Sequence, residues 1–238
     1  MRRRLLLIGH RGASAVAPEN TRAAILAAFR AGADMVELDV QMTRDGRLVI
    51  FHDDRLERTT NGTGRLSASR YADLTPLDAG SWFAPRFARE RILLLSQALR
   101  LPPRQMTLNL ELKWTPKRQA LIRAVLRTIR TARVSRRVLV SSFDARLLRP
   151  LVSTGLRYAL ICRTNPDRSL RQAIRLRCAA WHPFSTLITP RRITTAHAAG
   201  LRVHVWTVDD PRRARQLIRL GIDGLFTNHP ARLRTVVG

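Results

Sequence analysis

The chain has 238 residues, of which 45% are hydrophobic, which is enough for one large α/β domain or two small ones. Its two cysteines, Cys162 and Cys178, form no CxxC pair, which argues against a disulfide framework and indicates a reducing compartment. The formal net charge is +26, and all but two of the 43 basic residues are arginine.

The chain opens with an apolar run that predicts a strand at residues 5–10, followed by a helix at 21–32 that Gly32 ends. The start, MRRRLLLIGHRG, resembles the charged and apolar regions of a signal peptide. Its apolar stretch, Leu5 to Ile8, is shorter than the roughly 7–15 residues that such a signal requires. We therefore interpret it as a core strand of a cytoplasmic protein, and no transmembrane span is predicted.

Two extended segments, 35–42 and 47–53, are separated only by a short turn sequence around 44–46. A parallel crossover would need about a dozen residues or more, so these segments are predicted to pair as an antiparallel hairpin. Residues 54–105 follow as an irregular insertion, whose end at 93–101 can be helical.

Strand-like and helix-like segments alternate through the rest of the chain. Further strands are predicted at 107–113, 138–143, 157–162, 178–184, 202–208 and 224–230, with helices at 116–132, 144–155, 167–177, 190–200 and 210–221. Without the return strand of the hairpin, eight core strands alternate with helices, which is typical of a (β/α)8 TIM barrel. A doubly wound sheet is the rival, but polar residues close nearly every strand, as expected at the active-site face of a barrel. We predict a single domain over 1–238, with the insertion lying over that mouth.

Three carboxylates interrupt two of the predicted strands. Glu37 and Asp39 lie in MVELDV, and Glu111 lies in LNLELK. Strand alternation puts Glu37 and Asp39 on one face, and it puts Asn109, Glu111 and Lys113 on one face. Buried carboxylates require paired charges or a cation, and oxygen ligands favour Mg²⁺ or Ca²⁺. Buried salt bridges to arginine are the alternative to a metal site.

Two histidines close strands beside these acids: His10 ends the first strand and His52 ends the return strand of the hairpin. Together they can act as general acid and general base, because the pKa of histidine lies near the operating pH. The alternative is that each is an ordinary core or surface histidine. His182 and His229 also close strands, and no role is assigned to them.

Two cations, Arg11 and Lys113, are predicted at the same rim, where they could hold phosphate oxygens or pair with the site acids. Trp206 could form a wall of the pocket, or it could be an aromatic residue of the barrel core. In the PENT stretch, Asn20 or Thr21 can cap the following helix, and Glu19 or Asn20 could contact ligand or metal.

The positive charge has two interpretations. One is a nucleic-acid or anionic-membrane partner. The other is a set of arginines scattered over surface helices, as at Arg123, Arg127 and Arg130, and the absence of a basic tail favours this second interpretation. A positive surface would still attract anionic substrates.

The blocks GHRGASAVAPENT, VELDVQMTRDGRLVIFHD, LNLELK, VHVWTVDD and GIDGLFTNHP resemble the glycerophosphodiester phosphodiesterase family, in the family's order and over nearly the whole chain. Two departures are peripheral: ILLLSQAL stands where the family often has a proline-threonine-leucine stretch, and TNHP stands where an aspartate and an aromatic residue are frequent.

The resemblance implies a barrel related to phosphatidylinositol-specific phospholipases C and metal-dependent hydrolysis of glycerophosphodiesters to glycerol 3-phosphate and an alcohol. The resemblance matches His10 and His52 to the family's acid–base pair. It also matches Glu37, Asp39 and Glu111 to the metal ligands, and Arg11 and Lys113 to the cations that contact phosphate.

Two alternatives to this function remain. One is a phospholipase D-like or lysophospholipase D enzyme of the same fold that acts on lipids. The other is a basic protein that binds nucleic acid or membranes. The predicted partner is a small-molecule glycerophosphodiester. No specific nucleic-acid partner is expected, and peripheral contact with an anionic membrane is compatible with the positive charge.

Overall fold

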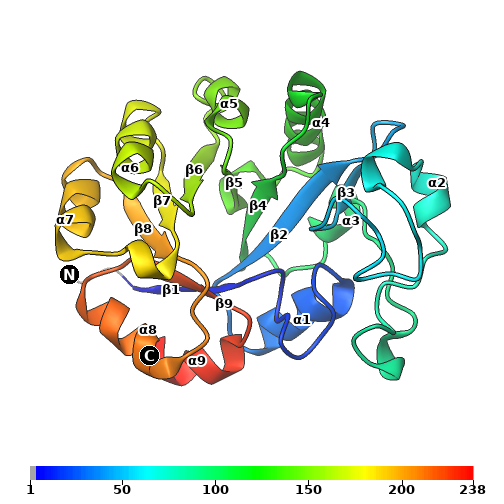
Figure 1. The fold of residues 1–238 in the computed structure, drawn as a ribbon, viewed down its shortest axis with the longest axis horizontal. Helices are drawn as coiled ribbons and strands as arrows, with labels where there is room; N and C mark the ends of the chain where they lie inside the picture. Colours follow the sequence, from blue (N-terminus) through cyan, green and yellow to red (C-terminus); the bar gives the residue numbers. More distant parts are fainter. Residues whose placement is uncertain (1–3, 238) are drawn as a thin grey trace.

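The computed structural model describes residues 4–237, in which a closed parallel barrel is the central feature (Figure 1). The first strand, β1 (Leu6–Gly9), pairs in parallel with both β2 (Met35–Met42) and β9 (Gly224–Thr227), and this double pairing closes the ring. Between β2 and β9 the parallel strands are β4 (Thr107–Leu112), β5 (Val138–Ser142), β6 (Arg157–Cys162), β7 (Ala180–Pro183) and β8 (Arg202–Val205). The predicted (β/α)8 barrel is confirmed.

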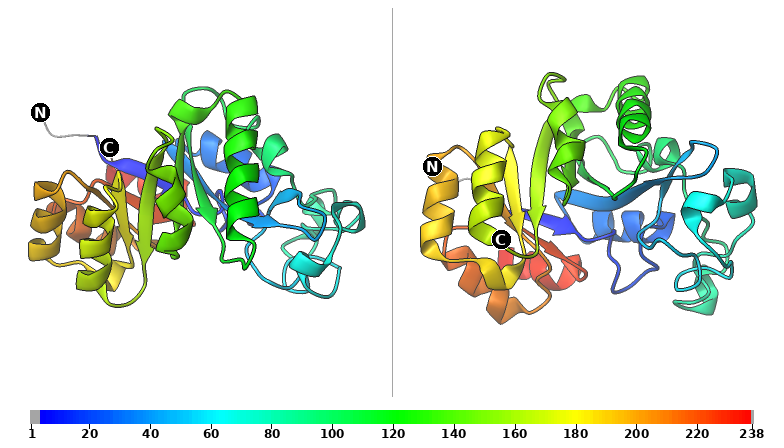
Figure 2. Two further views of the ribbon diagram at one scale, coloured as in Figure 1. Left: turned by 90° about the horizontal axis from the view of Figure 1, so that it is seen from above. Right: turned by 45° about the horizontal axis from the view of Figure 1, so that its top comes forward.

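Helices surround the barrel, and most of them lie near their predicted positions (Figures 1 and 2). They are α1 (Arg22–Arg30), α4 (Arg118–Thr131), α5 (Ala145–Leu148), α6 (Pro166–Arg175), α7 (Pro190–Ala198), α8 (Pro211–Arg219) and α9 (Pro230–Val237). The last of these was not predicted, because the final strand was extended to residue 230. Among residues 4–237, none of the helices is both long and apolar enough to cross a membrane.

The short helix predicted at 144–155 is confirmed only over its first part. The segment forms only the four-residue α5, and a 3-10 turn follows at Arg149–Leu151. Pro150 explains the break, because its ring has no N–H to donate and clashes with the preceding turn of an α-helix. The strand predicted at 178–184 is likewise shorter, since β7 covers Ala180–Pro183.

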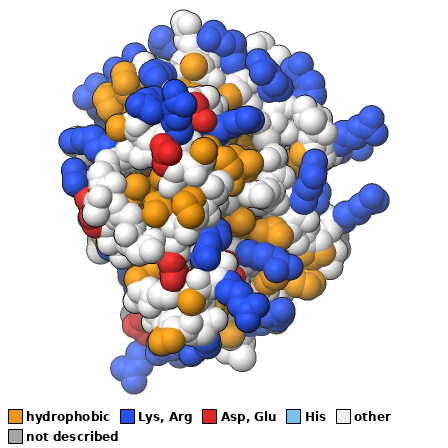
Figure 3. Space-filling view, turned by 90° about the vertical axis from the view of Figure 1, so that its right-hand side faces the viewer, with side chains coloured by type: hydrophobic (Ala, Val, Ile, Leu, Met, Phe, Trp, Pro, Cys, Tyr) orange, Lys and Arg blue, Asp and Glu red, His pale blue; other side chains and the backbone are white. Residues whose placement is uncertain are grey.

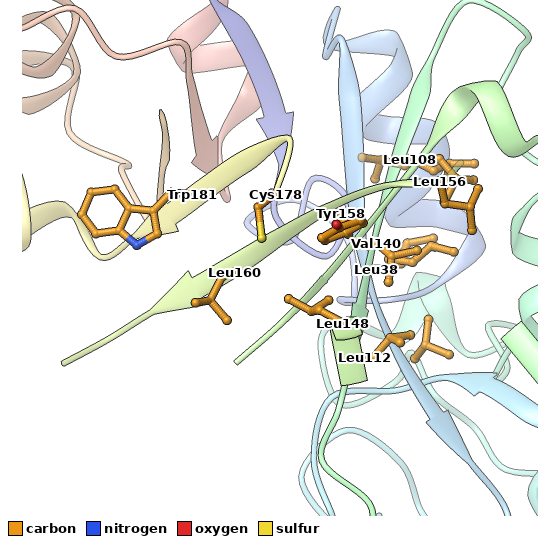
Figure 4. Close-up of a cluster of buried hydrophobic side chains, with 14 of the residues drawn as sticks. Leu38, Leu108, Leu112, Val140, Leu148, Leu156, Tyr158, Leu160, Cys178 and Trp181 are labelled. Atoms are coloured by element: carbon orange, nitrogen blue, oxygen red, sulfur yellow. The ribbon is translucent and has the colours of Figure 1, made fainter. Parts of the chain in front are cut away.

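Alternation along the strands separates two environments. Side chains that face the helices form the large hydrophobic core, and Figure 4 shows part of it around Leu38, Val140 and Tyr158. Side chains that face the barrel axis are apolar low in the barrel, where Leu139, Ala159 and Ala180 pack together. The polar side chains of the inner face therefore lie higher, toward the carboxyl ends of the strands.

The hairpin is confirmed, because β3 (Leu48–Ile50) pairs antiparallel with the end of β2, with Ile50 opposite Val40. The segment after it contains only short elements: α2 (Tyr71–Leu74), α3 (Leu95–Ala98) and 3-10 turns at Leu66–Ala68 and Pro85–Phe87. α3 confirms the helix that was expected within 93–101.

The insertion has a small hydrophobic core of its own, built mainly on Val49, Phe51, Leu56, Leu66, Leu74, Ala79 and Ile92. It lies at one side of the barrel, away from α6 and α7 (Figures 1 and 2). The expectation that it would cover the mouth is not met, because none of its described residues lines the cavity there. It flanks the mouth because its apolar residues pack on β3 rather than on the barrel interior.

Candidate active site

Glu37, Asp39 and Glu111 come together where β2 and β4 run side by side. In the register of these strands Asp39 lies opposite Glu111, and Glu37 lies opposite Asn109. One oxygen from each carboxylate can be chosen so that all three lie within 4.8 Å of one another. Oε1 of Glu37 is buried without a hydrogen-bond partner within the described chain. Oxygen donors at this spacing form a site that could hold a divalent cation.

Burial and mutual repulsion dominate the electrostatics of this group. Burial, followed by the charges of Asp39 and Glu111, holds the pKa of Glu37 well above its ordinary value. Burial and the Asp39 charge also raise the pKa of Glu111. Although burial opposes ionisation of Asp39 too, Lys113 and Arg11 hold its pKa below the ordinary value. Negative charge is therefore concentrated at a site whose cations balance it only in part.

Lys113 and Arg11 contact the carboxylates directly. Nζ of Lys113 donates to Glu111 Oε1 at 2.7 Å and to Asp39 Oδ1 at 3.2 Å. Nε of Arg11 lies 3.4 Å from Asp39 Oδ2, while its Nη1 donates to Glu19 at 2.9 Å. Since a lysine has three N–H donors and an arginine five, both cations keep donors for another ligand.

The loop after β1 holds two of these groups in place through its backbone and its PENT stretch. The Arg11 N–H donates to Glu37 Oε2 at 2.8 Å. The Asn20 side chain donates to Asp39 Oδ2 at 2.8 Å and accepts from the Asp39 N–H at 3.2 Å. Gly12 has a φ of +87°, and a Cβ there would lie 2.5 Å from the backbone of Ala24. Only glycine lets the loop pack this closely on α1. Thr21, not Asn20, caps that helix.

His10 is oriented by a residue that the sequence analysis did not identify. Its Nδ1 donates to Asn228 Oδ1 at 2.8 Å, and Asn228 Nδ2 donates in turn to Asp209 Oδ2 at 2.7 Å. Because the asparagine oxygen only accepts, the proton of a neutral His10 lies on Nδ1, and Nε2 is left free to act. Burial, together with the Arg11 charge, lowers the pKa of His10.

His52 is held in the same manner from the other side of the mouth. Its Nδ1 lies 2.5 Å from Asp53 Oδ1, and Arg58 of the insertion pairs with both Asp53 and Glu19. Burial lowers the pKa of His52, and the nearby Asp39 charge opposes that shift. Each histidine therefore has an anchored Nδ1, and neither pKa is raised above the ordinary value.

A cavity of about 170 Å³ joins these groups at the mouth of the barrel. Its ionic side is lined by His10, Arg11, Glu37, His52, Asn109, Glu111 and Lys113. The other side is lined mainly by Phe143, Ile161, Arg163, His182, Trp206 and Phe226. Asp39 lies behind this lining, bonded to Lys113 and Asn20. The structure thus brings all the predicted site residues to one place, and Trp206 is at the wall where it was expected.

His182, which lines the cavity, forms a buried pair with His204. Their facing nitrogens lie 3.2 Å apart, and both side chains are 1% exposed. Gly224 makes room for this pair, since a Cβ there would lie 3.0 Å from the His204 ring. Burial lowers the pKa of His204 to about 4 and holds that of His182 well below its ordinary value. Both rings are therefore neutral in the folded protein near pH 7.

The unfolding free energy is expected to fall as the pH drops from about 6.5 toward 4. In that window the unfolded chain protonates His204, whereas the folded chain, with a pKa of about 4 at this residue, does not. The loss amounts to about 3 kcal/mol for this one residue at the acid end. Urea denaturation at a series of pH values measures it, and His204→Asn should flatten the slope. An equal flattening by His197→Asn, at a partly exposed histidine, would contradict this assignment.

Comparisons with known proteins agree with the geometry. The model of the glycerophosphoryl diester phosphodiesterase family matches residues 10–232. A glycerophosphodiester phosphodiesterase of Caldanaerobacter subterraneus subsp. tengcongensis is 34% identical over 240 residues, which cover 98% of this chain and 97% of that protein.

Solved structures give the same result. A phosphodiesterase of Oleispira antarctica in complex with the product sn-glycerol-3-phosphate has a TM-score of 0.91 and 30% identity, covering 98% of this chain and 97% of that one. A glycerophosphodiester phosphodiesterase of Agrobacterium tumefaciens has a TM-score of 0.83 and 28% identity, covering 95% of this chain and 97% of that one.

Proposed function

The chain belongs to the glycerophosphoryl diester phosphodiesterase family, and we propose that it hydrolyses glycerophosphodiesters to sn-glycerol 3-phosphate and an alcohol. Family membership makes it a phosphoric diester hydrolase. The observation that carries the proposal is a single cavity that joins two anchored histidines to the cations Arg11 and Lys113 and to two members of the carboxylate cluster, Glu37 and Glu111. The similar Oleispira enzyme was solved with sn-glycerol-3-phosphate bound, which supports this choice of product.

The carboxylates would hold one divalent cation, Mg²⁺ or Ca²⁺. Glu37, Asp39 and Glu111 supply hard oxygen donors, and the unpartnered Oε1 of Glu37 is available to a cation. When bound, the cation supplies positive charge that neutralises the phosphate and stabilises the charge of the transition state. The remaining N–H donors of Arg11 and Lys113 bind phosphate oxygens beside it.

The two histidines divide the proton transfers. One takes a proton from the nucleophile, which is water or the glycerol hydroxyl of the substrate, through its free Nε2. The other gives a proton to the leaving alkoxide as the P–O bond breaks. Trp206 lines the wall beside the organic part of the substrate. We also propose a cytoplasmic location, in keeping with the free thiols of Cys162 and Cys178.

The direct test is an assay of purified protein on a panel of glycerophosphodiesters and lysolipids, each with Mg²⁺ or Ca²⁺. Release of sn-glycerol 3-phosphate is the readout. The proposal expects cation-dependent release from soluble glycerophosphodiesters. Release of no sn-glycerol 3-phosphate from any of them, with either cation, would refute it.

Asn228→Ala is expected to lower kcat by about one to two orders of magnitude, because His10 loses the acceptor that fixes its tautomer and orientation. The KM for glycerophosphocholine and the affinity for the cation should stay near wild type. Ser14→Ala is the matched control, since it removes the other donor to Asn228 without touching His10. Equal activity of Asn228→Ala and Ser14→Ala would show that the asparagine does not position the histidine.

A further inference from the structure

Aromatic side chains line the half of the mouth that lies away from the carboxylates. Phe143, Phe184 and Trp206 follow the ends of β5, β7 and β8. The Trp206 ring lies 5.6 Å from Phe143 and 5.1 Å from Phe184, measured between centroids, and both contacts are edge to face. The mouth is therefore divided into an ionic half over β1, β2 and β4 and an aromatic half over β5 to β8.

Large apolar side chains also project into solvent around this mouth. Trp114, directly after Lys113 at the end of β4, is 65% exposed. Phe143 is 47% exposed, and Val16, in the loop after β1, is 54% exposed. All three follow the carboxyl ends of barrel strands, so they share one end of the molecule. Exposed apolar residues gathered around a cavity are typical of a binding surface rather than of scattered surface residues.

Exposed cations without counter-ions accompany them. Arg163 follows β6, Arg168 lies in the first turn of α6, and Lys117 precedes α4. Within residues 4–237 none of these three side chains forms an ion pair. Two acids near the mouth are already paired, since Glu19 contacts Arg11 and Arg58, and Asp144 contacts Arg146.

The molecule as a whole carries the same sign of charge. Its net charge is +26, and Figure 3 shows Lys and Arg side chains spread over the face that carries the insertion, with few acids between them. A positive molecule with aromatic side chains at one end is complementary to an anionic lipid surface, where tryptophan prefers the interface and Lys and Arg approach lipid phosphates.

We propose that the mouth rim, defined as Val16, Trp114, Lys117, Phe143, Arg163 and Arg168, docks on the surface of an anionic phospholipid bilayer. Trp114 enters the headgroup region, and the cations of the rim contact lipid phosphates. Docking in this orientation turns the cavity toward phosphodiesters that lie at the membrane. Because docking needs no hydrolysis, it goes beyond the proposed function.

Vesicle binding tests the docking directly. Full-length protein is titrated with phosphatidylcholine vesicles that either contain or lack phosphatidylglycerol. The expected result is binding to the anionic vesicles, weakened by salt, with a blue shift of tryptophan emission. Trp114→Ser should abolish most of the shift and weaken binding by about tenfold or more, as expected for loss of one large buried apolar side chain.

Val152→Ser is the matched apolar control. Val152 is 53% exposed but precedes β6, so it lies at the opposite end of the barrel. Binding by Val152→Ser should equal that of wild type. If Trp114→Ser and Val152→Ser bind equally well, or if wild type does not bind anionic vesicles, the proposal is overturned.

A second pair of variants tests orientation by charge. Arg168 and Arg175 are exposed residues in the first and last turns of the same helix, α6, and so lie toward opposite ends of the barrel. Arg168→Gln should weaken vesicle binding by about fivefold, the effect of removing one cation near an anionic surface, and Arg175→Gln should have little effect. Equal losses would mean that binding depends on the positive charge of the whole protein and not on the mouth rim, which would contradict the proposal.

Two further measurements separate the causes of failure. Thermal unfolding of each variant should match wild type, which excludes misfolding as the source of weak binding. His10→Ala protein should bind vesicles as wild type does. Vesicle binding therefore tests docking separately from phosphodiester hydrolysis.

Discussion

Replacing either His10 or His52 with alanine is expected to lower kcat for sn-glycerol 3-phosphate release by about two to four orders of magnitude. Each histidine has its Nδ1 anchored, by Asn228 or by Asp53, and presents the other nitrogen to the cavity. Since one must accept a proton and the other donate one, neither can replace its partner. Steady-state assay of glycerophosphocholine with saturating cation measures the loss.

His197→Ala is the control for these variants. His197 is a partly exposed histidine that pairs with Asp223 and does not line the cavity. It should leave kcat near wild type. If His10→Ala and His52→Ala both retained wild-type kcat, the two-histidine mechanism would be wrong, whichever histidine is the acid.

Glu37→Gln is expected to have opposite effects on stability and on cation binding. Without a cation, burial and repulsion from Asp39 and Glu111 raise the pKa of Glu37, so replacing this carboxylate with an amide should make the variant more stable than wild type by about 1 kcal/mol. With a cation at a hundred times its dissociation constant, wild type should gain about 2.7 kcal/mol of unfolding free energy, and the variant should gain far less.

Thermal unfolding with increasing Mg²⁺ or Ca²⁺ measures both effects without any assay of activity. Asp54→Asn is the control, because this exposed acid near the mouth makes no side-chain hydrogen bond or ion pair within residues 4–237. A chelator should abolish hydrolysis by wild type. An unchanged cation response in Glu37→Gln would show that the cation binds elsewhere.

The carboxylate cluster could be predicted from the sequence because its geometry depends mainly on strand alternation. Residues i and i+2 share a face, so Glu37 and Asp39 had to lie together, as did Glu111 and Lys113. The β2–β4 register then sets Asp39 opposite Glu111. The eight predicted strands, with polar residues at the ends of nearly all of them, favoured the barrel over a doubly wound sheet, and a barrel brings these strand ends to one mouth.

Other features depend on contacts that no local pattern specifies. Asn228 reaches His10 only because β9 closes the ring beside β1. The pairing of His182 with His204 follows from the register of β7 and β8, which the sequence does not encode locally. α5 was predicted too long because its apolar pattern outweighed a visible break at Pro150. The position of the insertion depends on packing against β3, whereas its composition indicated only that it contains little regular secondary structure.

The hydrogen bond between His10 and Asn228 joins positions 218 residues apart. During synthesis on the ribosome, the first of these residues leaves the exit tunnel long before the last strand exists. A contact of such sequence separation forms late, after the loop-closure cost of the whole barrel has been met. His10 is therefore anchored only when β9 docks, and an incompletely translated chain would carry the carboxylates and His52 without an oriented His10 beside them.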